Sequence, residues 1–352
     1  MPLIERIVLM RSFALPGFVL AAAAAVLWGT AGTAQTFISS PTLSPLWVGA
    51  LRIVCASFFF YPMLFIERAK SKVGSSIFDE HKGAATGRGA FALKVLAAGI
   101  AMALFNLLFF TGVKMAGVAL GSCTIIGSAP VWAGLLDAVV RKKTPDRLWI
   151  VGVALAIAGG VWMAVSQAEN VAVNGVGLAI CLAAGFFYAG YSMLAKELVA
   201  VATPVKATTL AFSVAGVIAI GAAFAFSEMP EFRPADLLVV AYLGLFTTGV
   251  AYLLYGTALK TTRVSTCVAL GLLEPVTAFV LAVTVVGENV NPWATVGLAA
   301  ILAGLAVVLK SEQLERLRAL ATEEKETKAA LEPEKKTNGA TKKNAQALAD
   351  AA

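Results

Sequence analysis

The stretch LGLLEPVTAFVLAVTVVGE, residues 270–288, is long and apolar enough to cross a membrane, yet it carries an acid and a proline side by side. A carboxylate such as Glu274 is costly in hydrocarbon, and Pro275 removes a backbone hydrogen bond from the helix that contains it. Polar residues inside a span usually face the interior of a helix bundle or an aqueous cavity. The pair therefore points to a site inside a larger membrane protein.

The composition of the whole chain supports this interpretation. Of its 352 residues, 59% are hydrophobic and 14% are charged, and the mean hydropathy is +0.82. Soluble domains are about 25% charged, and apolar stretches of about 18 or more residues recur along this chain. The sequence predicts an all-α, multi-pass membrane protein. The net charge of +7 lies in short loops and termini rather than along one face, so the expected partner is the lipid bilayer and not nucleic acid.

Apolar runs between charged or turn-rich breaks predict ten transmembrane helices, and the distribution of Lys and Arg predicts their orientation. Alternate segments hold 25 of the 28 Lys and Arg residues, and the intervening loops hold two. By the positive-inside rule both termini are cytoplasmic, and the short loops suit a cell (inner) membrane. The predicted spans are 16–37, 45–66, 91–113, 118–140, 148–166, 176–195, 207–227, 237–258, 264–286 and 292–310.

Several functional classes are not expected from this sequence. The four cysteines fall inside predicted spans and the single histidine, His81, lies in a charged loop, so we expect no metal site, no cofactor and no His-dependent catalytic residues. No Walker motif is present, which argues against direct ATP drive. An intramembrane enzyme would need a partner for Glu274, and the sequence offers no second central acid or histidine. We therefore expect that the chain is not an enzyme.

The chain repeats itself with the second copy inverted. SAPVWAGLLDAVV (128–140) aligns with LEPVTAFVLAVTV (273–285) at an offset of 145, and the first and sixth spans align at an offset of 160. Five helices per copy is an odd number, so the copies cross the membrane in opposite directions. The predicted organisation is an N-terminal cytoplasmic segment (1–15), a first five-helix repeat (16–166), a second repeat (167–310) and a charged cytoplasmic tail (311–352). Small residues at Gly152, Ala156, Gly160, Ala300 and Gly304 predict close packing of the fifth and tenth spans.

Over roughly residues 16–310 the sequence resembles the drug/metabolite transporter superfamily, and within it the EamA-type carriers. The matching features are Trp28-Gly29, Arg52, Ala129-Pro130-Val131, Glu274-Pro275-Val276 and Gly287-Glu288. The first copy departs from the family pattern at the end of its fourth span, where residues 140–143 read Val-Arg-Lys-Lys instead of Gly-Glu. The resemblance implies a secondary transporter of small metabolites, and export of amino acids or related compounds by alternating access is the expected activity.

Glu274 and Arg52 are the expected centre of the substrate or coupling site. At 1.5 Å per residue their backbones differ in depth by only about 5 Å, so the two charges could meet directly or through water. Three roles for Glu274 remain open: binding a proton, holding the ammonium group of a substrate, or forming a static pair with Arg52 that fixes helix packing.

The other candidate residues are two prolines and five aromatic residues. Pro130 and Pro275 occupy matching places in the two repeats and are predicted hinges, each freeing the carbonyl one turn earlier, that of Ile126 and that of Gly271. The expected lining of the site also includes aromatic side chains, although residues of this kind near helix ends also serve as membrane-interface anchors. These aromatic candidates are Trp28, Tyr188, Tyr191, Tyr252 and Tyr255.

One alternative function comes from another class. A membrane receptor or scaffold could keep this fold, transport nothing and act through its cytoplasmic tail. The sequence predicts neither the coupling ion nor the oligomeric state.

Overall fold

The computed structural model describes residues 16–70, 87–166, 174–287, 291–315, 317–318 and 321–322. This part of the chain contains ten helices long and apolar enough to cross a membrane, and it contains no β-strand. The predicted all-α, ten-span fold is confirmed. The N-terminal segment 1–15, His81, Glu288 and most of the charged tail lie outside the described residues.

Eight of the ten spans are single helices, and the eighth and ninth are divided. The first seven are α2 (Gly17–Gln35), α3 (Pro45–Lys70), α4 (Arg88–Ala116), α5 (Val118–Val140), α6 (Arg147–Ser166), α7 (Gly175–Val201) and α8 (Pro204–Phe226). The eighth span consists of α9 (Pro234–Tyr242), the π-helical η1 (Leu243–Val250) and α10 (Ala251–Thr261). The ninth consists of α11 (Val264–Leu270), α12 (Leu273–Leu281) and the π-helical η2 (Ala282–Val286), and the last is Ala294–Glu315.

Local sequence signals explain several of these boundaries. Asn174 begins α7, because its side chain accepts a hydrogen bond from Gly177 N, and Thr203 begins α8 in the same way, with Pro204 as the first helical residue. Gly117 joins α4 to α5 at a φ of +85°, a conformation that favours glycine. The short turns leave neighbouring helices antiparallel.

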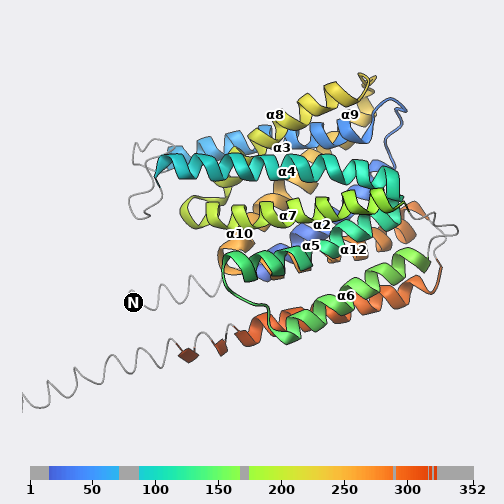
Figure 1. The fold of residues 1–352 in the computed structure, drawn as a ribbon. Helices are drawn as coiled ribbons and strands as arrows, with labels where there is room; N and C mark the ends of the chain where they lie inside the picture. Colours follow the sequence, from blue (N-terminus) through green and yellow to red (C-terminus); the bar gives the residue numbers. More distant parts are fainter. Residues whose placement is uncertain are drawn as a thin grey trace, which may run out of the picture. The chain divides into compact units, whose positions relative to one another are not determined.

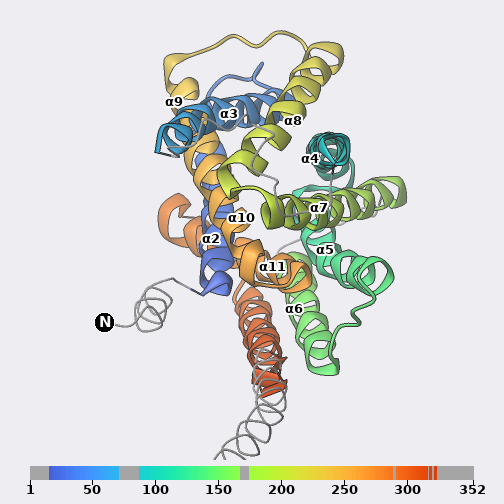
Figure 2. The same cartoon turned by 90° about the vertical axis from the view of Figure 1, so that its left-hand side faces the viewer.

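The chain divides into two compact units, Met1–Val308 and Leu309–Ala352. The first unit contains the membrane bundle (Figures 1 and 2), and its helix contacts repeat when the two halves are exchanged. Helix α4 packs on α7 as α10 packs on α2, α5 packs on α7 as α12 packs on α2, and α3 packs on its own counterpart α8. This arrangement is that of two inverted five-helix repeats related by a pseudo-two-fold axis.

Glycines bring α6 and the last span into backbone contact. A Cβ added at Gly159 would lie 2.6 Å from Gly297 O, and one added at Gly304 would lie 2.5 Å from Gly152 O. These distances are too short for any side chain, so the two helices cross where neither has one. The predicted close packing of the fifth and tenth spans is confirmed, with Gly159 rather than Gly160 at the crossing.

The wide turn η1 fits closely against α3. The hydroxyls of Thr247 and Thr248 both donate to Leu243 O, at 2.8 and 2.9 Å, and satisfy a carbonyl in the widened helix. Glycine at position 244 leaves room for Cys55 of α3, because an added Cβ would overlap the Cys55 side chain. This contact supports the part of α3 that carries Arg52.

Gly159 and Gly160 form a matched pair for testing the crossing. We expect Gly159→Ala to lower the free energy of unfolding by about 1–3 kcal/mol, because the new methyl group would meet the backbone of Gly297 and Ile301. Gly160→Ala should change it by less than about 0.5 kcal/mol, since a Cβ there would lie 3.6 Å from Cys123 Sγ. Unfolding in detergent micelles measures both values. Equal stability of the two variants would contradict this account of the crossing.

Candidate transport site

A cavity of about 70 Å³ lies inside the bundle, between the two halves. Helices of both repeats contribute to it, from α2, α3, α4 and α5 on one side and from α7, α10, α11 and α12 on the other. It is lined by Trp28, Ala31, Arg52, Phe105, Phe109, Ile125, Ile126, Ala129, Tyr188, Tyr252, Val268, Gly271 and Glu274. Five of the seven residues expected at the substrate or coupling site are among them, and Tyr191 and Tyr255 are not.

Along three helices the cavity lies close to one end of the bundle. Arg52, Phe109 and Ile125 each lie seven residues from the end of their helix at Pro45, Ala116 and Val118. At 1.5 Å per residue this is a depth of about 10 Å. We call this end of the bundle the Asp236 end, after the first-turn acid of α9, and the opposite end the Asp137 end, after the last-turn acid of α5.

Glu274 stands at a break in the ninth span. Between α11 and α12 the backbone makes tight turns, in which Leu272 N donates to Ala269 O and Glu274 N donates to Gly271 O at 2.9 Å. The prediction that Pro275 frees the Gly271 carbonyl is therefore wrong, because the Glu274 N–H occupies it. The break places Glu274 in the first turn of α12, where its charge is favourably placed against the helix dipole.

The two predicted hinge positions differ in their surroundings. Helix α5 continues through Pro130, whereas the ninth span is interrupted just before Pro275. The matching prolines therefore occupy one intact and one broken helix.

Arg52 and Glu274 share the cavity wall, but they do not contact each other. In the described part of the chain no ion pair within 4.0 Å joins them, and Arg52 Nε is buried without a hydrogen-bond partner. The nearest aromatic face to the guanidinium is Phe110, with its ring centroid 6.0 Å from Arg52 Cζ. The space between the two charges is part of the cavity.

The five aromatic candidates form one cluster. The Trp28 ring centroid lies 5.1 Å from that of Tyr252, 5.3 Å from that of Tyr255 and 6.1 Å from that of Tyr188. Tyr191 joins through Tyr252, at 5.8 Å. The four tyrosines are buried inside the bundle, so none of them acts as an anchor at the membrane interface.

The cluster closes the cavity on the side of the Asp137 end. Along α7 and α10, Tyr191 and Tyr255 lie nearer that end than the cavity-lining Tyr188 and Tyr252. Tyr255 is fully buried, and its hydroxyl donates to Ser192 Oγ at 2.8 Å. Tyr191 and Tyr255 therefore form the second layer beneath the cavity wall.

Three polar groups of the cavity-lining residues are buried without a hydrogen-bond partner. They are Trp28 Nε1, Arg52 Nε and the Tyr188 hydroxyl, and each can donate a hydrogen bond. Buried donors normally have a partner, so Trp28 Nε1 and Arg52 Nε are available to acceptor oxygens in the cavity, whereas the Tyr188 hydroxyl also interacts with that of Tyr255. Glu274, on the same wall, is the one lining residue that offers a negative charge.

The repeat symmetry is broken where the charges lie. At the offset of 145 Glu274 corresponds to Ala129, and at the offset of 160 Arg52 corresponds to Phe212. Both Glu274 and Ala129 line the cavity, whereas Phe212 packs on Tyr252 at a centroid distance of 4.8 Å. Each half thus contributes one charge, at a different position of the shared fold.

The apolar lining of the cavity is not among the residues predicted from the sequence. Phe105 and Phe109 of α4 and Ile125 of α5 resemble lipid-facing residues in composition, and only the packing of α4 and α5 against α7 turns them inward. The four-residue spacing of Phe105 and Phe109, which places both on one helix face, was the available signal.

Comparison with known proteins agrees with this geometry. The EamA-like transporter family matches the chain twice, over residues 15–165 and 175–310. The chain belongs to the EamA-like transporter family. It is therefore a transporter rather than an enzyme, and a multi-pass protein of the cell (inner) membrane that acts on a small-molecule substrate.

Two relatives of this EamA-like transporter match most of its length and part of its length, respectively. It is 32% identical over 285 residues to the uncharacterized transporter YwfM of Bacillus subtilis, covering 81% of this chain and 90% of the relative. An uncharacterized transporter of Clostridium kluyveri is 26% identical over 141 residues, covering 39% of this chain and 45% of that protein. A solved crystal structure has the same fold, with a TM-score of 0.70 at 17% identity, covering 85% of this chain and 98% of the other.

The separation of Arg52 from Glu274 can be tested by stability measurements. We expect Arg52→Met to change the free energy of unfolding by less than about 1 kcal/mol, because no direct ion pair is lost and a buried unpartnered group is removed. Unfolding of Arg52→Met, Glu274→Gln and the double variant would measure their coupling. A loss of about 3 kcal/mol in Arg52→Met that Glu274→Gln restores would show instead that the two form a static structural pair.

Proposed function

We propose that this EamA-like transporter exports amino acids or closely related small metabolites, by alternating access of the central cavity to the two membrane faces. The observation that carries the proposal is the chemistry of the cavity wall. One guanidinium and two neutral donors lie on the same cavity as one carboxylate, among aromatic and aliphatic side chains. Such a site offers complementary partners to both charged groups of a zwitterion.

Each part of an amino acid has a candidate partner in the cavity. The substrate carboxylate would accept hydrogen bonds from Trp28 Nε1 and Arg52 Nε, which have no other hydrogen-bond partner, and from the Tyr188 hydroxyl. Its ammonium group would face the carboxylate of Glu274, with aromatic faces nearby to favour a cation. An apolar side chain would pack on Phe105, Phe109 and Ile125.

The cavity volume limits what can be bound in this conformation. At about 70 Å³ it is much smaller than the roughly 300–1,000 Å³ of sites for drug-sized ligands. A substrate larger than the smallest amino acids would need the helices to separate. Movement of the broken ninth span, with Pro275 as its hinge, and bending of α5 at Pro130 are the proposed means.

Glu274 has two candidate roles within this mechanism. It binds the substrate ammonium directly, or it carries a proton whose movement drives export. The predicted orientation, with both termini and the Asp137 end in the cytoplasm, makes the Asp137 end the side from which an exporter loads its substrate.

Counterflow of radiolabelled amino acids in proteoliposomes tests the site. We expect Arg52→Ala to weaken substrate binding about tenfold or more, because removing a charged hydrogen-bond partner costs about 1.5–3 kcal/mol. If the Glu274 carboxylate holds the substrate ammonium group, Glu274→Gln should also reduce counterflow. If the Glu274 carboxylate carries the proton, Glu274→Gln should keep counterflow and lose its stimulation by a pH gradient.

The matched control is Glu231→Gln, the same change at an exposed carboxylate outside the cavity. Normal counterflow and normal pH response of Glu274→Gln would refute the central role of Glu274. No counterflow by the wild-type protein with any amino acid would refute the proposed substrate class.

The scaffold alternative makes a different prediction. We expect a chain that ends at Arg318, beyond the last membrane span, to retain wild-type counterflow, because the cavity is built from residues 28–274. The same assay measures it, with the protein level in the membrane as the control. A truncated chain that is well expressed but inactive would assign an essential role to the tail.

A further inference from the structure

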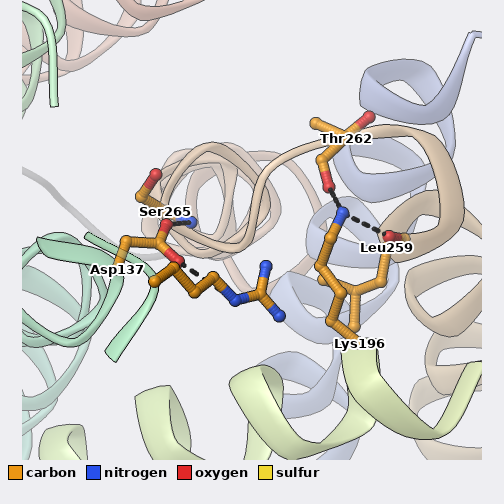
Figure 3. A network of polar contacts seen from close by, with 6 residues as sticks. Asp137, Lys196, Leu259, Thr262 and Ser265 are labelled. Atoms are coloured by element: carbon orange, nitrogen blue, oxygen red, sulfur yellow. Dashed lines mark hydrogen bonds and ion pairs between the residues drawn. The ribbon is translucent and has the colours of Figure 1, made fainter. Parts of the chain in front are cut away.

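A polar network joins the two halves at the Asp137 end (Figure 3). Asp137 in the last turn of α5 accepts a hydrogen bond from Ser265 N, at the start of α11, with 3.3 Å between the nitrogen and Oδ2. Both residues are buried, at 5% and 3% exposure. Asp137 belongs to the first half of the transporter and Ser265 to the second, so this bond crosses between the halves.

The backbone around Asp137 is fixed by contacts within the first half. Arg141 Nε lies 3.8 Å from Asp137 Oδ1, and the backbone N–H groups of Arg141 and Lys143 both donate to Asp137 O at 3.1 Å. The chain turns back here through Lys142, whose φ of +53° is uncommon for a residue other than glycine. The backbone at the end of α5 is therefore fixed around Asp137, and the hydrogen bond from Ser265 N to Oδ2 orients the carboxylate.

The backbone that leads to Ser265 is also fixed, by contacts within the second half. Lys196 of α7 donates to Leu259 O at 2.8 Å and to Thr262 O at 2.6 Å, and so caps the end of α10 (Figure 3). The cation of Lys196 lies at the negative, C-terminal end of the α10 dipole, and the carboxylate of Asp137 lies at the positive, N-terminal end of the α11 dipole. Both placements are favourable. Lys196, Leu259 and Thr262 all belong to the second half, so Lys196 fixes the α10–α11 corner within its own half.

The packing of the helices shows that the Asp137–Ser265 bond lies between the cavity and the Asp137 end of the bundle. Helix α11 packs mainly on α5 and also touches α2 and α7, whereas α12 and η2 pack on α2. The two symmetry-related spans are thus in contact near the Asp137 end and have different neighbours further along. The cavity lies beyond this contact, bounded by Ile126 and Ala129 of α5 and by Gly271 of the ninth span.

The symmetry counterpart of this bond is apolar. At the offset of 145, Asp137 corresponds to Ala282 and Ser265 corresponds to Leu120. If the two halves exchange conformations during transport, the equivalent contact at the opposite end would join Leu120 and Ala282, and Ala282 has no carboxylate to accept the Leu120 N–H. The Asp137–Ser265 bond therefore has no symmetry-related equivalent, and the bond from Ser39 N to Asp236 at the opposite end uses a different position of the fold.

We propose that Asp137 is a positioning residue that latches the Asp137 end of the transporter shut, through its hydrogen bond to Ser265 N. Opening at this end breaks the bond and parts α5 from the α10–α11 corner, which Lys196 keeps intact. The inference rests on alternating access by this chain, as in the proposed function, but not on the identity of the substrate.

Cys267 provides a reporter that needs no substrate. It lies two residues after Ser265, one residue before the cavity-lining Val268, and is 1% exposed. The parent for the experiment would carry alanine at the three other cysteines. Its Cys267 would be treated with a membrane-impermeant maleimide in vesicles that expose either face.

We expect Asp137→Ala to raise the rate of Cys267 modification about tenfold from the face that carries the Asp137 end, because a charge-assisted hydrogen bond is lost. Asp137→Asn, which keeps a neutral acceptor, should give a smaller increase. The matched control is Asp236→Ala, since Asp236 also accepts a backbone N–H across the halves, from Ser39 at 2.7 Å, but at the opposite end. It should leave the rate unchanged from the Asp137 face.

Two results would overturn the proposal. One is an unchanged rate in Asp137→Ala; the other is an equal increase from Asp236→Ala, which would indicate general loosening. A second measurement does not depend on the reactivity of Cys267. In a chain without native cysteines, Asp137→Cys combined with Ser265→Cys should form a disulfide that stops transport until it is reduced, and transport that continues with the disulfide formed would also refute the latch.

Discussion

Hydrocarbon offers no hydrogen-bond partner, and this constraint governs the whole transporter. The backbone can satisfy itself only as helices, and the polar side chains of the spans must turn inward. Three polar groups satisfy this constraint by facing one cavity between the halves, namely those of Arg52, Glu274 and the Trp28 indole nitrogen. The same constraint makes the cavity selective, because donors left without a protein partner favour a solute that supplies acceptors.

Inversion of the repeat converts one five-helix unit into a closed bundle. Helices that face outward in one copy would find no partner, but the second copy presents the same faces in the opposite direction. The glycine crossing of α6 with the last span and the pairing of α3 with α8 both lie where a helix meets its own counterpart. Charge departs from this symmetry at Glu274, Arg52 and Asp137, which are the positions on which the proposed transport cycle depends.

Much of this arrangement was predictable from the sequence, for physical reasons. A span is recognised by its unbroken apolar run, and the similar depths of Arg52 and Glu274 follow from counting residues along two helices. The apolar lining was not predictable, because Phe105 and Ile125 have the same character whether they face lipid or a cavity. The break at Gly271 and Leu272 and the wide turn η1 depend on competing backbone hydrogen bonds that a pattern of residue types does not resolve. The sequence did not predict a role for Asp137, because a charged residue at the end of a span ordinarily faces water.

The pseudo-two-fold axis has a consequence for how this protein has diverged. Residues of one half have counterparts at equivalent positions of the other half, so the chain contains two versions of one five-helix unit. Ala129 and Ala282 occur where the other half has Glu274 and Asp137, which means that the shared scaffold tolerates both an acid and a methyl group at these two places. At these two places one five-helix plan thus carries two different side chains, and the acids are what distinguish one half from the other.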